Sequence, residues 1–174
     1  IYGGLLVGGL AVYLYGRKHQ LSFLPLADAT APGLMLGYGV GRIGCQVSGD
    51  GDWGIPNPNP QPEWLSWLPD WTWAYAYPNN VNGIFGPRAA GYTGKLIEEP
   101  SPWPIFEGYG TYLDPAVFPT AFYETVLATL IFGFLWSLRK RISVPGRLFA
   151  MYLVCNGLER FWIEKIRVNA WKLP

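Results

Sequence analysis

The stretch FYETVLATLIFGFLWSL, residues 122–138, decides the fold because it is an apolar run with a single charge, Glu124, near its start. At a rise of about 1.5 Å per residue, a helix over this run and its flanks crosses the hydrocarbon core of a bilayer. Of the 174 residues, 50% are hydrophobic and only 14% are charged, against about 25% charged residues in a typical soluble domain. The sequence therefore predicts a membrane protein.

Three further apolar segments flank this run along the chain. Residues 1–15 are nearly all apolar, with glycine pairs that allow close helix contact in lipid, and residues 148–166 are apolar in their first half. Prolines and an aspartate interrupt residues 23–40, so we expect a broken helix there, buried against its neighbours beside a cavity. The fold class that follows is an all-α polytopic membrane protein with about four transmembrane helices.

The distribution of charge predicts the topology. Two short loops are basic, and the positive-inside rule places both at the cytoplasmic face; they contain Arg17, Lys18, Arg139, Lys140, Arg141 and Arg147. Counting crossings makes residues 50–120 extracytoplasmic, and acidic residues outnumber basic ones there. We expect two transmembrane segments and a motif in residues 1–54, a large irregular extracytoplasmic insertion in 55–118, and two transmembrane helices in 119–174.

The insertion has two unusual stretches. Four prolines in residues 56–62 rule out a helix or a central strand and predict a rigid exposed loop. Six aromatic residues follow, and they either pack a small external subdomain, lie at the headgroup level, or contact substrate; they are Trp64, Trp67, Trp71, Trp73, Tyr75 and Tyr77.

Several classes of function find no support in the composition. The net charge of +1 and the lack of a basic, aromatic surface pattern argue against a nucleic-acid partner. Cys45 and Cys155 lack the spacing of a metal site, and His19 lies in a polar loop, so we expect no metal and no organic cofactor. Because the chain begins at Ile1 inside an apolar run, we expect it to be an N-terminally truncated fragment.

Residues 41–54 read GRIGCQVSGDGDWG and place a charge directly after an apolar segment. A cation at that boundary needs a partner, and glycines allow the backbone to turn tightly around it. We therefore expect Arg42 to bind an anion such as a lipid phosphate.

The last apolar segment carries a second group of polar residues. Four of them are spaced four, four and three apart, so they project from one face of a helix; they are Asn156, Arg160, Glu164 and Arg167. An intrahelical ion pair between Arg160 and Glu164 is the simplest interpretation of this face. A functional site is the other, since ionisable residues within membranes are commonly functional.

Three blocks of sequence resemble the prolipoprotein diacylglyceryl transferases, membrane enzymes that begin bacterial lipoprotein maturation. They are residues 41–54, residues 118–124 (FPTAFYE), and NGLER at 156–160 followed by Glu164 and Arg167. The resemblance implies transfer of a diacylglyceryl group from phosphatidylglycerol to the lipobox cysteine of a preprolipoprotein. It also implies a multi-pass protein of the bacterial inner membrane with its active site towards the extracytoplasmic side.

The resemblance assigns roles to residues of each block. Arg42 and Arg160 would bind the phosphate as catalytic residues, while Asp50 and Glu164 would orient or neutralise these arginines. Glu124 would bind the glycerol hydroxyls, although a glutamate in the first turn of a helix is also a common surface arrangement. The expected substrate-binding set is Ser48, Gly49, Asp50, Glu124, Asn156, Glu164 and Arg167.

The chain departs from the family pattern at several positions. Cys45, Ser48 and Asp50 stand where Asn, Asn and Glu are common, and Tyr2 stands where many members have a histidine. The thiol would then be activated by Tyr2 together with Arg160 or by a carboxylate, or histidine is not required. A covalent intermediate on Cys45 is a further alternative. Two other functions remain open: a catalytically impaired lipid- or lipoprotein-binding homologue, and a small membrane transporter.

Overall fold

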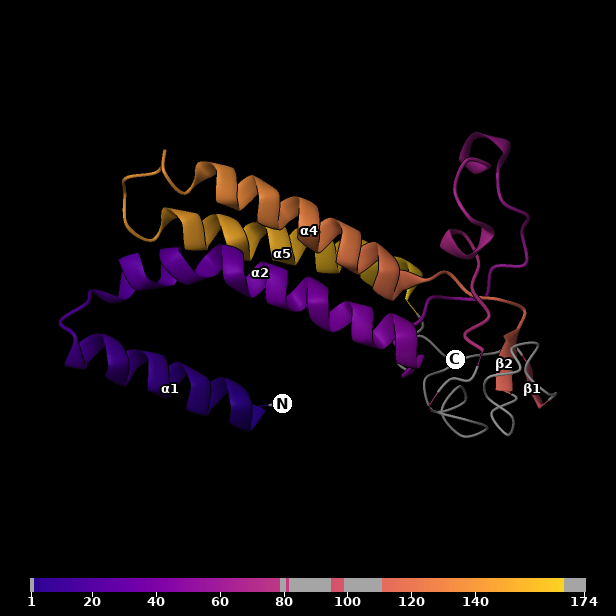
Figure 1. The fold of residues 1–174 in the computed structure, drawn as a ribbon, viewed down its shortest axis with the longest axis horizontal. Coiled ribbons are helices and arrows are strands. Elements are labelled where there is room, and N and C mark those ends of the chain that lie inside the picture. Colours follow the sequence, from indigo (N-terminus) through magenta and orange to yellow (C-terminus); the bar gives the residue numbers. More distant parts are fainter. Residues whose placement is uncertain (1, 79–80, 82–94, 99–110, 168–174) are drawn as a thin grey trace. The chain divides into compact units, whose positions relative to one another are not determined.

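The computed structural model describes residues 2–78, 81, 95–98 and 111–167 (Figure 1). In this part of the chain the long helices are α1 (Tyr2–Lys18), α2 (Phe23–Ser48), α4 (Thr120–Leu138) and α5 (Arg147–Ile166). Each of them covers one of the four predicted apolar segments. The described chain is therefore mostly helical, as the sequence predicts.

Helix α4 is, among the described helices, the one long and apolar enough to cross a membrane. Large apolar side chains on it are exposed, including Leu130 at 65% and Phe134 at 47%. Helix α1 has only 17 residues, α2 carries prolines and charged residues, and α5 carries several charges. One helix thus meets the criteria of length and composition, and the other three spans stay predictions.

Helix α2 is continuous over 26 residues, so the prediction of a broken segment is wrong. Pro25 lies in the first turn, where a backbone N–H has no partner within the helix. Pro32 lies inside the helix and is buried. It removes a single N–H from the ladder of hydrogen bonds, and a long helix packed against neighbours tolerates this loss.

The helix also continues through Gly41 and Gly44, where the sequence favoured a tight turn. The turn comes later, at Gly49 and Gly51, whose φ angles are 60° and 99°. Glycine adopts such positive φ values without a steric penalty, and Gly49 N–H donates to the Cys45 carbonyl over 3.0 Å to close the last helical turn. Asp52 therefore lies just beyond the end of α2.

The chain forms two compact units, and the first comprises residues 1–37 and 128–157. In this unit the carboxylate of Asp28 accepts hydrogen bonds from Gly146 N–H at 2.6 Å and Phe149 N–H at 2.8 Å. These groups belong to the N-terminal end of α5, which has no helical acceptors for its first N–H groups. A residue of α2 thus caps α5 with a negative charge.

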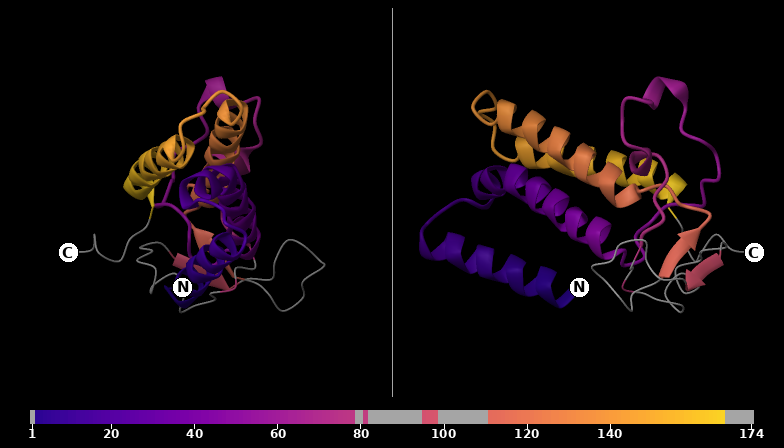
Figure 2. Two further views of the ribbon diagram at one scale, coloured as in Figure 1. Left: turned by 90° about the vertical axis from the view of Figure 1, so that its left-hand side faces the viewer. Right: turned by 45° about the vertical axis from the view of Figure 1, so that its right-hand side comes forward.

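The second unit comprises residues 38–127 and 158–174 and contains a small sheet that the all-α prediction missed. Strands β1 (Lys95–Glu98) and β2 (Thr111–Asp114) pair antiparallel, with Lys95 opposite Asp114 (Figure 2). The buried core of this unit outside the helices is Trp53, Tyr77, Leu113 and Val117. Residues 82–94 and 99–110 of the predicted insertion lie outside the described residues.

The predicted aromatic group divides into packed and exposed members. Tyr77 is 2% exposed, lies 5.5 Å from Trp53 between ring centroids, and donates a hydrogen bond to Gln46 Oε1 over 2.8 Å. Burial raises the pKa of Tyr77 far above its ordinary value, so its hydroxyl remains a donor. Trp64 and Trp67 are instead 73% and 76% exposed. Only part of the group therefore packs into the buried core of the second unit.

Candidate active site

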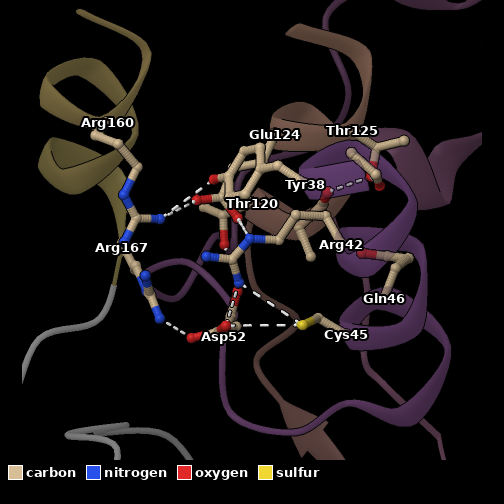
Figure 3. A network of polar contacts seen from close by, with 12 residues as sticks. Tyr38, Arg42, Cys45, Gln46, Asp52, Thr120, Glu124, Thr125, Arg160 and Arg167 are labelled. Atoms are coloured by element: carbon tan, nitrogen blue, oxygen red, sulfur yellow. Dashed lines mark hydrogen bonds and ion pairs between the residues drawn. The ribbon is translucent and has the colours of Figure 1, made fainter. Parts of the chain in front are cut away.

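Within the second unit, parts of α2, α4 and α5 bring two arginines to one buried carboxylate (Figure 3). Glu124 of α4 is 1% exposed, and its Oε2 lies 2.7 Å from Nε of Arg42, on α2. Its other oxygen, Oε1, lies 2.9 Å from Nη1 of Arg160, on α5. A buried carboxylate requires partners of this kind because desolvation of an unpaired charge is very costly. Glu124 thus joins the first and last sequence motifs.

A second carboxylate, that of Asp52, joins Arg42 to Arg167. Asp52 Oδ2 contacts Nη1 of Arg42, and Asp52 Oδ1 contacts Nη2 of Arg167. Two hydrogen bonds hold the backbone around this contact. Ile55 N–H donates to the carbonyl of Ile166, next to Arg167, over 2.8 Å, and Thr120 Oγ1 donates to the Asp52 carbonyl over 2.7 Å. Asp52 therefore holds the residue that follows α5 against the end of α2.

These contacts form a chain of alternating charges, which we call the arginine cluster: Arg160, Glu124, Arg42, Asp52 and Arg167. Arg42 is buried, whereas the side chain of Arg160 is 42% exposed. Burial lowers the pKa of Arg167, and the nearby charge of Arg42 acts in the same direction. The cluster is thus suited to accept a further anion.

Tyr38 contacts both arginines that bind Glu124. Its ring centroid lies 5.3 Å from the guanidinium carbon of Arg42, and its hydroxyl accepts a hydrogen bond from Arg160 Nη1 over 3.2 Å. The same hydroxyl lies 3.4 Å from Oε1 of Glu159, to which it donates. Glu159 is 4% exposed. An aromatic ring and a second buried carboxylate therefore belong to the site.

Cys45 lies at the edge of the arginine cluster. Its sulfur is 3.7 Å from Arg42 Nη1 and 3.8 Å from Asp52 Oδ2. Cys45, Asp50 and Asp52 each place a possible ligand atom within 4.8 Å of one another, as a metal site does. Because Asp52 already contacts two guanidinium groups, we assign it to the arginine cluster rather than to a metal.

The structure brings together four of the predicted site residues: Arg42, Glu124, Arg160 and Arg167. Asp52 also contacts Arg42 and Arg167, as the sequence analysis expected of Asp50. The role of Asp50 stays a prediction. Asp50 is exposed in the turn at residues 49–51, and a carboxylate oxygen of Asp50 lies within 4.8 Å of one of Asp52.

The other predicted residues are Ser48, Gly49, Asn156, Glu164 and Tyr2. Ser48 and Gly49 end α2, where their backbone groups bond to Val81 N–H and to the Cys45 carbonyl. Asn156 Nδ2 lies 3.9 Å from Met35 Sδ within the first unit. Glu164 is half-buried on α5, and Tyr2 begins α1 with a side chain outside the described part.

Sequence reasoning missed Tyr38, Asp52 and Glu159. Tyr38 precedes Arg42 by four residues, so a continuous helix through both would have placed them on one face. Glu159 adjoins Arg160 in a motif that the sequence analysis used only for the arginine. Asp52 was harder to predict as a partner of Arg42. The sequence of this glycine-rich stretch does not indicate which of its two aspartates contacts the arginine.

Sequence comparison relates this chain to one family of known proteins. The sequence model of the family described as prolipoprotein diacylglyceryl transferase matches residues 1–173. A relative from Corynebacterium efficiens is 32% identical over 170 residues, which make up 97% of this chain and 44% of that protein. One from Corynebacterium glutamicum is also 32% identical, over 97% of this chain and 45% of its own length.

A relative from Leptospira interrogans is 27% identical over 176 residues, covering 99% of this chain and 42% of its own length. All three are described as phosphatidylglycerol–prolipoprotein diacylglyceryl transferases. The chain spans less than half the length of these curated relatives. No solved structure matches the chain.

Proposed function

The chain belongs to the prolipoprotein diacylglyceryl transferase family, and from this we propose that it transfers a diacylglyceryl group from phosphatidylglycerol to the lipobox cysteine of preprolipoproteins. The protein would act as a transferase whose nucleophile, the cysteine thiol, comes from the peptide substrate. Glycerol phosphate would be the second product.

The partly exposed guanidinium group of Arg160 is the observation that carries this proposal. Arg160 contacts both Glu124 and Tyr38 through the same nitrogen, Nη1, and its side chain is 42% exposed. Its guanidinium therefore keeps donors that can reach a ligand, and arginine binds phosphate in a bidentate manner. Arg160 would bind the phosphate of the lipid, with Arg42 held behind it by Glu124.

The chemistry requires stabilisation of the departing phosphate. As sulfur attacks the glyceryl carbon, the carbon–oxygen bond breaks and its electron pair passes to the phosphate. Fixed cations beside the developing charge lower the barrier more than solvent does, because they need not reorganise. The ion pairs with Glu124 and Asp52 would hold the guanidinium groups in place.

For the membrane, we propose a multi-pass arrangement in the bacterial inner membrane with the arginine cluster towards the extracytoplasmic side. Helix α4 supports the crossing, and the basic residues that follow it support a cytoplasmic position for its C-terminal end. The predicted parts 1–54, 55–118 and 119–174 remain our proposal for the division of the chain.

The test is an assay of lipid transfer from phosphatidylglycerol to a peptide bearing a lipobox cysteine. Arg160→Ala should reduce kcat/KM about 100-fold, since the loss of one donor to a developing charge costs about that much. Arg139→Ala is the matched control, because Arg139 is exposed and lies outside the arginine cluster. A peptide with serine in place of the cysteine should give no product.

Retained activity of Arg160→Ala would contradict its role at the phosphate. If the unaltered protein binds phosphatidylglycerol but yields no lipidated peptide, it is the impaired lipid-binding homologue that Tyr2 suggests.

A further inference from the structure

The proposed reaction needs a group that takes up the proton of the incoming thiol. A cysteine thiol has an ordinary pKa of about 8.5, so most of it is protonated at neutral pH. A general base must lie within hydrogen-bonding reach of that proton, directly or through one intermediate group. The described residues contain two buried carboxylates, Glu124 and Glu159.

Glu124 is poorly suited to this task because both of its oxygens are engaged by cations. Oε2 lies 2.7 Å from Nε of Arg42, and Oε1 lies 2.9 Å from Nη1 of Arg160. Taking up a proton there would weaken an ion pair that positions a phosphate-binding arginine. Glu124 therefore acts as the anchor of the arginine cluster rather than as a base.

Glu159 differs from Glu124 in its partners. Its Oε1 accepts a hydrogen bond from the hydroxyl of Tyr38 at 3.4 Å. Its Oε2 is buried and has no hydrogen-bond partner among the described residues; Glu124 Oε2 also has none, but it forms an ion pair with Arg42. No salt bridge of Glu159 is present in the described part of the chain, so this carboxylate can accept a proton without breaking an ion pair.

Tyr38 connects this buried carboxylate to the phosphate-binding arginine. Its hydroxyl oxygen lies 3.2 Å from Nη1 of Arg160, whereas Glu159 is 4% exposed and too buried to meet a peptide itself. The proposed function places the breaking bond beside Arg160. A thiol that attacks the adjoining carbon would then approach the hydroxyl of Tyr38.

We propose that Tyr38 and Glu159 form a proton relay that activates the thiol. The thiol proton moves to the phenolic oxygen of Tyr38 while the phenolic proton passes to Oε1 of Glu159. The sulfur bonds to the glyceryl carbon, and the carbon–oxygen bond breaks with its electron pair going to the phosphate. The proton then returns through Tyr38 to the departing phosphate. Arg42, Glu124 and Arg160 are the charged groups that face the relay.

The relay rests on the proposed function, and the pH dependence of transfer tests it. General acid–base groups contribute about 100-fold or more, so Glu159→Gln and Tyr38→Phe should each lower kcat about 100-fold at pH 7 with little change in KM. Near pH 9.5 the thiol ionises without a base, and both deficits should shrink to within about 10-fold. A peptide with selenocysteine, whose selenol is ionised at neutral pH, should restore both variants at pH 7.

Matched controls are Glu63→Gln and Tyr75→Phe, which change the same residue types outside the arginine cluster and should follow the wild-type profile. A loss in the relay variants that is equal at every pH and is not restored by selenocysteine overturns the relay in favour of a structural role. Wild-type rates in both variants also overturn it. If the wild-type protein itself makes no lipidated peptide, the proposed function fails and the relay fails with it.

Discussion

At the scale of single residues, Glu124 holds two guanidinium groups that come from distant parts of the sequence. Arg42 and Arg160 are separated by more than a hundred residues, and each contacts its own oxygen of the same carboxylate. Removal of one member of a buried ion network leaves the others as uncompensated charges. Glu124 therefore serves both stability and the orientation of the phosphate site.

Replacement of Glu124 by Gln should destabilise the protein by about 3–5 kcal/mol, because Arg42 stays buried with one fewer partner. Thermal unfolding in detergent, followed by circular dichroism, measures this loss. Glu63→Gln alters an exposed glutamate and should leave the transition unchanged. Equal transition temperatures for the two variants would show that the ion pairs of Glu124 contribute nothing to stability.

The sequence predicted the arginines of this site better than their partners. Arg42 and Arg160 stand out because a cation in or beside an apolar segment requires a partner. The choice between Asp50 and Asp52 depends on φ angles at Gly49 and Gly51, which a glycine-rich stretch leaves open. The contact between Tyr38 and Glu159 joins α2 to α5, so it could be identified only from the three-dimensional structure.

At the scale of elements, the positions of the four helices followed from apolar runs, but the continuity of α2 and its end at Ser48 did not. Two prolines and an aspartate in this segment suggested an interruption of the helix. In the structure the aspartate instead binds backbone groups at the start of another helix. Asp28 accepts two N–H groups at the start of α5 while α2 continues past Pro32. A polar residue in an apolar segment therefore marked a contact between helices rather than a break.

Asp28→Ala should destabilise the first unit by about 1–2 kcal/mol, since caps of this kind contribute roughly that much. Asp28→Asn retains an acceptor oxygen and should recover part of the loss. Hydrogen exchange at the amides of Gly146 and Phe149, together with thermal unfolding, tests both variants. Unchanged protection of these two amides in Asp28→Ala would refute the capping role.

At the scale of the whole molecule, Gly54 lies where three distant stretches of the second unit come together. Its N–H donates to the Phe118 carbonyl over 2.8 Å. A Cβ atom at Gly54 would lie 2.7 Å from Phe118 Cβ and 2.9 Å from the Ile166 carbonyl oxygen. The space that glycine leaves allows residues 54, 118 and 166 to approach one another.

Gly54→Ala should destabilise the protein by about 1–3 kcal/mol, the usual range for overpacking. It should also reduce lipid transfer, because the same approach holds Arg167 near Asp52. Gly133→Ala in α4 is the control: nothing lies within 4 Å of its added Cβ, and alanine favours a helix. Identical thermal unfolding of the two variants would contradict the close packing at Gly54.

The small sheet and the split of the aromatic residues show what the sequence could not predict at this scale. β1 and β2 are four residues each and lie in a region with many prolines and aromatic residues. Leu113 of β2 belongs to a buried core with Trp53 and Tyr77, a contact that no local sequence pattern indicates. Exposed Trp64 and buried Tyr77 have similar sequence surroundings and different tertiary neighbours.

The continuity of α2 has a consequence for how this protein can change length during evolution. Tyr38, Arg42 and Gln46 follow one another at intervals of four residues, and they contact α5, α4 and Tyr77 respectively. One inserted residue among them would rotate the remainder of the helix by about 100° and misalign every later contact. Length should therefore be invariant across residues 38–46, while the exposed turns around Trp64 and Trp67 can gain or lose residues freely.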